Sequence, residues 1–113
     1  MSNRLPPVMA LAALALALAG GARADPVAAA LVRHGCAACH EIPGIPGATG
    51  RVGPPLGGFS RQAYIAGRLP NDRDALVRWL LDPAAIKPGT AMPATGLDAR
   101  TAGLIADRLR RPP

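Results

Sequence analysis

The chain has 113 residues, half of them hydrophobic and only 3% aromatic, and it carries a formal net charge of +6. This length allows one small domain. The basic residues include a single lysine and form no run with interleaved aromatic residues, so the composition argues against a protein that binds nucleic acid.

The N-terminal segment, residues 1–24, has the layout of a secretory signal peptide. Arg4 precedes an unbroken apolar run over residues 8–19, which is too short to cross a membrane as a helix, and an A-x-A cleavage signal ends at Ala24. We therefore expect export to the periplasm and a mature domain of residues 25–113; an uncleaved membrane anchor is the alternative. Cleavage removes two arginines and lowers the net charge from +6 to +4.

Apolar residues recur at helical spacing in three segments, which predicts an all-α chain. The first segment, about 26–34, begins with a proline that suits a first helical turn and leads into the cysteine segment. The second begins after a cap at Asn71 or Asp72 and ends before Pro83. The expected buried faces consist of Ala28, Leu31 and Val32 in the first segment and Leu76, Trp79 and Leu80 in the second.

The third helix is expected from a cap at Asp98 to about Arg110, with an apolar stripe of Ala102, Ile105, Ala106 and Leu109. Two stretches between the helices, 42–58 and 83–96, are too rich in proline and glycine for regular structure. No alternating apolar pattern of strand length is present. Loops this long are unusual in a small domain unless they wrap something.

The predicted core is thin, because the mature chain has only three aromatic residues, Phe59, Tyr64 and Trp79. A domain of this size usually needs additional stabilisation, such as a disulfide or a bound group. Cys36 and Cys39 could form one disulfide, but so short a loop would constrain little of the unfolded chain. The sequence therefore indicates that something else fills the core.

Both cysteines lie in the segment CAACH, residues 36–40, which has three interpretations. A redox dithiol of the thioredoxin type accompanies a βαβ pattern, and this sequence has no strand to carry one. A zinc site would take all four ligands, His34 included, from seven residues, where adjacent Cys39 and His40 chelate one metal poorly. Haem attachment uses every residue, because both thiols form thioethers and the histidine lies under the iron. This attachment occurs on the exported side of a membrane, so the signal peptide favours haem.

A second axial ligand can be sought by elimination. Met92 is the only methionine outside the predicted signal peptide, and Gly89 and Pro93 give its segment an irregular shape. His34 lies two residues before the first cysteine, on the same side as His40, so we expect an ordinary surface residue there. Met92 is therefore the candidate for the far side of the iron.

The chain resembles the class I cytochromes c in the segments CAACH, GPPL, YIAGRLPN, WLLDP and KPGTAMP, which follow in this order over nearly all of residues 25–113. It is also similar to the cytochrome c domains of some terminal oxidase subunits. The resemblance implies the class I cytochrome c fold, all-α, with three main helices and long Pro/Gly-rich loops wrapped around one covalently bound haem c.

The resemblance also implies roles for individual residues. Cys36 and Cys39 would bond the haem, and His40 and Met92 would be its proximal and distal ligands. The carbonyl of Pro54 would accept a hydrogen bond from the His40 ring, which orients a ligating imidazole.

Three further residues carry weaker implied roles. Trp79 would pack its ring beside the haem, although plain core packing would also explain it. Arg61 and Tyr64 are candidates for the haem propionates, or else surface residues of an irregular loop. The last helix departs from the family because IADRL lacks the usual aromatic residue, so we expect weaker contact between the first and last helices.

The function implied by the resemblance is an exported one-electron carrier, not an enzyme, with no small-molecule substrate. Two axial ligands leave no open position on the iron, and methionine raises the redox potential. The basic surface suggests a redox protein partner with an acidic docking surface. The alternatives are an electron-transfer subunit of a larger respiratory complex, such as a terminal oxidase or periplasmic dehydrogenase, a ligand-binding or peroxidase-like haem protein, and a thiol oxidoreductase.

Overall fold

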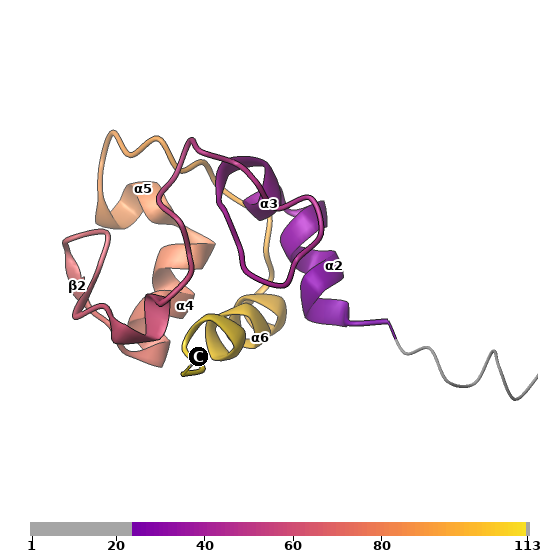
Figure 1. Ribbon diagram of the computed structural model, residues 1–113. Coiled ribbons are helices and arrows are strands. Elements are labelled where there is room, and N and C mark those ends of the chain that lie inside the picture. Colours follow the sequence, from indigo (N-terminus) through magenta and orange to yellow (C-terminus); the bar gives the residue numbers. More distant parts are fainter. Residues whose placement is uncertain (1–23, 113) are drawn as a thin grey trace, which may run out of the picture.

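The computed structural model describes residues 24–112, so the predicted signal peptide lies outside the described residues except for Ala24. The described part of the chain consists of helices that are connected by long irregular loops (Figure 1). Its α-helices are α2 (Pro26–Arg33), α3 (Cys36–Cys39), α4 (Arg73–Leu81), α5 (Pro83–Ile86) and α6 (Ala99–Leu109). The remaining elements are a 3-10 helix, η1 (Phe59–Arg61), and the strands β1 (Tyr64–Ile65) and β2 (Leu69–Pro70).

The three longer helices begin where aspartate side chains cap them. Asp25 accepts hydrogen bonds at the start of α2, Asp72 accepts one from the backbone N–H of Ala75 in α4, and Asp98 caps α6 in the same way. Each carboxylate satisfies backbone N–H groups that have no partner inside the helix. Of the two predicted caps for α4, the structure therefore uses Asp72, and the helix ends before Pro83 as expected.

The expectation of an all-α class I cytochrome c fold with three main helices is wrong. The described residues form five α-helices and a two-stranded antiparallel sheet, in which Tyr64 pairs with Pro70 and Ile65 with Leu69. Two-residue strands are too short to show an alternating apolar pattern. The short helix α5 escaped prediction because Pro83, which ends α4, also starts α5, where proline is well tolerated.

The core lies where α6 packs against both α2 and α4 (Figure 1). Leu31, Leu76 and Ile105, one from each helix, are almost fully buried. Val32 is 55% exposed, so the buried face of α2 includes Ala30 instead. The first and last helices are in contact without an aromatic residue between them, and the guanidinium of Arg108 pairs with the carboxylate of Asp25. None of the described helices is long and apolar enough to cross a membrane.

Candidate haem site

A largely apolar cavity of about 430 Å³ lies between the helices and the loops. This volume is in the range of cavities that bind small molecules and cofactors. Elements far apart in the sequence contribute to its walls, because α2, α3, α4 and α6 each supply side chains. The predicted site residues on its lining are Cys36, Cys39, His40, Pro54, Trp79 and Met92.

The short helix α3 places both cysteines on this wall. Gly35, with φ of 83°, turns the chain out of α2. The thiols then lie three residues apart, on one side of a single helical turn. Both cysteines are free. Burial raises the pKa of the Cys36 thiol, whereas a redox dithiol needs a lowered one. The surroundings of α3 therefore do not favour the thiol oxidoreductase interpretation.

The imidazole ring of His40 is held by the backbone at Pro54. Its Nδ1 lies 2.6 Å from the carbonyl oxygen of Pro54. Because a carbonyl only accepts, Nδ1 carries the proton. The other ring nitrogen, Nε2, then has a free lone pair and can bind a metal. The neighbouring Gly53 donates its backbone N–H to the carbonyl of Cys39 at 2.7 Å.

Gly53 is a site residue that the sequence analysis missed. A Cβ atom at this position would lie 2.3 Å from Cε1 of His40, so the backbone passes directly against the imidazole. Only a residue without a side chain leaves that space to the ring. The signal in the sequence was the glycine directly before the two prolines of GPP.

Met92 reaches the cavity from the segment between α5 and α6. It is half-buried, and its backbone N–H lies 3.3 Å from the hydroxyl oxygen of Thr90. Gly89, with φ of 81°, makes the turn before it. The cavity is thus lined by the CAACH segment and by a thioether that lies more than fifty residues further along the chain.

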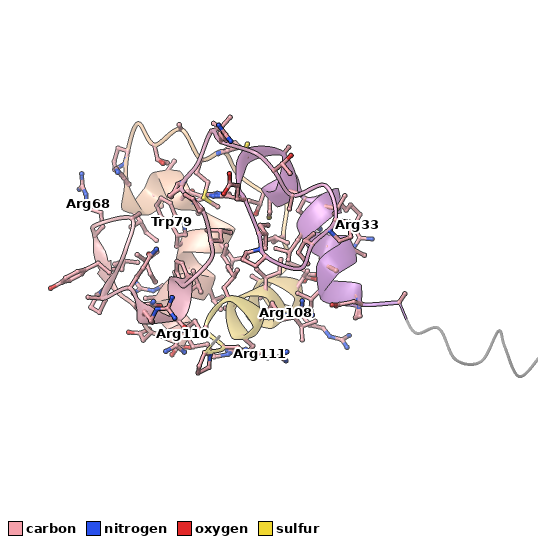
Figure 2. The ribbon with its side chains drawn as sticks, in the orientation of Figure 1. Arg33, Arg68, Trp79, Arg108, Arg110 and Arg111 are labelled. Atoms are coloured by element: carbon pink, nitrogen blue, oxygen red, sulfur yellow. The ribbon has the colours of Figure 1, made fainter. Side chains whose placement is uncertain are left out.

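Trp79 projects from α4, is only 9% exposed and lines the cavity. Figure 2 shows this side chain within the outline of the domain, with Arg68 and Arg33 labelled on opposite sides of it. Arg61, on η1, is exposed, and Tyr64, on β1, is 61% exposed; neither belongs to the cavity lining. Lys87 is the one charged side chain among the described lining residues.

The four ligands of the zinc interpretation do not come together. His34 lies outside the cavity lining, and its Nδ1 is 2.8 Å from the carbonyl oxygen of Thr95. Over residues 24–112, no group of three or more histidine, cysteine, aspartate or glutamate side chains is placed to hold a metal ion. His40 and Met92 both line the cavity, which makes them its candidate axial ligands.

Comparison with known proteins finds similarity to subunits of one respiratory enzyme. The chain is 37% identical over 62 residues to cytochrome c oxidase subunit 2 of Alkalihalophilus pseudofirmus, covering 54% of this chain and 17% of that protein. It is 36% identical over 76 residues to cytochrome c oxidase subunit 2 of Bacillus sp. strain PS3, covering 63% of this chain and 21% of that protein. The chain thus spans about a fifth of the length of these relatives. No family model matches the chain, and no solved structure matches it.

Proposed function

We propose that the described domain is an exported electron-transfer component of a respiratory terminal oxidase and holds one covalently bound haem c. The observation that carries the proposal is that Cys36, Cys39, His40 and Met92 line the same cavity. The similarity to cytochrome c oxidase subunit 2 supports the respiratory context.

The residues present fit such a group. The thiols of Cys36 and Cys39 would form its two thioether bonds, His40 would supply Nε2 to the iron, and the thioether of Met92 would be the second axial ligand. The space beside the imidazole, kept open by Gly53, lets the ring stay in the orientation that the Pro54 carbonyl fixes. When bound, haem supplies one-electron chemistry at its iron.

The ligand set favours electron transfer over catalysis. If His40 and Met92 both bound the metal, no position would be left on it for a substrate. The buried side chains of Trp79 and Leu76 line the same cavity and would limit the access of water to the bound group. A peroxidase-like protein would need one of these two positions open.

Covalent attachment is tested by expressing the full chain, with its N-terminal segment, in a bacterium that attaches haem to exported proteins. A denaturing gel stained for haem peroxidase activity should show haem on the wild-type chain, and the pyridine haemochrome spectrum should be that of a two-thioether haem. The variant with Cys36→Ala and Cys39→Ala should lose the stain. Met92→Ala is the matched control, because it removes a ligand but keeps both thiols and the stain. Haem that migrates with the double variant would contradict covalent attachment through these thiols.

The oxidase context needs a separate experiment. The domain should copurify with a terminal oxidase from its native host, and reduced protein should donate electrons to that enzyme. Because the net charge after cleavage is +4, we expect an acidic docking surface on the partner and an association rate that falls steeply with added salt. An association rate that does not change with added salt would show that the basic residues lie on a solvated surface and do not guide docking.

A freely diffusing carrier is the second candidate. It is favoured by the A-x-A signal that ends at Ala24, since cleavage there would release the domain from the membrane. Recovery of the protein in the soluble periplasmic fraction, with no oxidase subunit attached, would support this candidate over the first.

A further inference from the structure

His34 connects two parts of the chain that lie 61 residues apart. Its ring nitrogen Nδ1 lies 2.8 Å from the carbonyl oxygen of Thr95. A carbonyl oxygen cannot donate, so Nδ1 carries the proton and donates. The side chain is half-buried, not the ordinary surface residue that its position in the sequence suggested.

Thr95 extends this connection to a third part of the chain. Its hydroxyl donates to the carbonyl oxygen of Leu80 at 2.9 Å. Leu80 lies in the last turn of α4, where carbonyl groups have no partner inside the helix. Through one residue, the junction of α2 and α3 and the C-terminal end of α4 are therefore both joined to the segment that carries Met92.

The position of Thr95 gives these hydrogen bonds a consequence for the cavity. Thr95 is three residues after Met92, in the stretch between α5 and α6 that has no regular secondary structure. Such a stretch has few backbone hydrogen bonds of its own to keep it in place. The side chain of Met92 packs against the hydrophobic core, while the hydrogen bond of its N–H, at 3.3 Å to the Thr90 hydroxyl, stays within the same segment. The bonds at Thr95 attach the segment to elements outside it.

We propose that His34 and Thr95 are positioning residues that hold the Met92 segment in place over the cavity. The inference rests on the proposed function, because it assigns Met92 as a ligand. Neither residue belongs to the cavity lining. His34 lies just before the cysteine helix, so the same link fixes the distance between the wall that carries the thiols and the segment that carries the thioether.

The test measures how readily Met92 gives up the iron in the ferric holoprotein. The probe is imidazole, which binds only after the thioether detaches, and the weak long-wavelength absorption band of Met-ligated ferric haem reports the bound state. Loss of one hydrogen bond should raise the apparent affinity for imidazole roughly 2- to 10-fold. We expect this rise in His34→Ala and in Thr95→Val, which replaces a hydroxyl by a methyl group of nearly the same shape.

Conservative variants serve as matched controls. His34→Asn keeps an N–H donor near the position of Nδ1, and Thr95→Ser keeps the hydroxyl, so both should restore imidazole affinity toward that of the wild type. Hydrogen exchange of residues 87–98 should follow the same order and reports on the chain itself. If His34→Ala folds poorly, Thr95→Val with Thr95→Ser carries the comparison.

The outcomes separate the two proposals. A wild-type protein that lacks the methionine band, or has no covalent haem, would overturn the proposed function. A wild-type protein that has both, with imidazole affinity and exchange unchanged in His34→Ala and Thr95→Val, would overturn the positioning role alone. The positioning role would also be overturned if imidazole affinity rose in His34→Ala and Thr95→Val and rose equally in the conservative variants His34→Asn and Thr95→Ser.

Discussion

Gly53 and His40 are in direct contact, because a Cβ atom on Gly53 would lie 2.3 Å from Cε1 of the imidazole. Gly53→Ala should therefore displace the ring and break its hydrogen bond to Pro54. Overpacking of this kind costs typically about 1–3 kcal/mol. We expect a lower thermal midpoint and a lower yield of holoprotein. Gly57→Ala is the matched control, since its Cβ would come no closer than 3.2 Å, to Cγ of Pro43. Equal effects of the two substitutions would count against this role of Gly53.

If Met92 is an axial ligand, as proposed, it should control the redox potential. A thioether is a soft ligand that prefers ferrous iron. Met92→His should lower the potential by on the order of 0.1 V, within the roughly 0.8 V that axial ligands span, as measured by spectroelectrochemical titration. Met92→Ala should instead allow carbon monoxide to bind the ferrous protein. Ready binding of carbon monoxide by the wild-type protein would contradict ligation by Met92.

Folding should depend on the filling of the cavity, whose volume is about 430 Å³. An unfilled space of this size deprives the buried side chains that line it of packing partners, and so small a domain has little other stability to offset that loss. The variant with Cys36→Ala and Cys39→Ala, purified without haem, should therefore be largely disordered by far-UV circular dichroism. The wild-type holoprotein is the control and should unfold cooperatively. A cooperative thermal transition in the haem-free variant would refute this dependence.

The ion pair between Asp25 and Arg108 should make stability depend on acid pH. The hydrogen bond from the Arg108 guanidinium, followed by one from the N–H of Ala28, holds the pKa of Asp25 below its usual value of 3.8. A depressed folded-state pKa gives stability that is present above about pH 4 and is lost as the pH falls through the folded-state pKa. Asp25→Asn keeps the helix cap and removes the charge. Its thermal midpoint should lie below that of the wild type at pH 6, and the two should converge near pH 2. A constant difference would show that the charge is irrelevant.

Local signals explain what could be predicted from the sequence. The aspartate caps and apolar stripes of α4 and α6 lie within the helices themselves, so their bounds followed closely. The CAACH segment and Met92 were identified as candidates from the sequence, and the structure brings them to one cavity. The hydrogen bond between His40 and the Pro54 carbonyl came from the family resemblance and not from any local pattern.

Features that depend on distant partners could not be predicted. The exposure of Val32 depends on where α6 packs on α2. The role of Gly53 depends on the imidazole of His40, thirteen residues earlier in the chain. The partner of His34 is 61 residues away. The strands β1 and β2 pair over only two residues, and their hairpin turns through Ala66, whose φ is 51°. Positive φ is uncommon in residues other than glycine, so no sequence rule for alanine would suggest this turn.

If haem is attached at CAACH as proposed, the loop after α3, which folds back tightly against this segment, bears on the order of events in biogenesis. A Cβ atom on Gly50 would lie 2.3 Å from the carbonyl oxygen of Ala38, between the two cysteines, so the returning chain covers that helix at backbone distance. An enzyme that joins haem to the thiols would have to reach CAACH before this cover is in place. Attachment would therefore come first, on the newly exported chain, and closure of the loop afterwards would make the product inaccessible to the enzyme that made it.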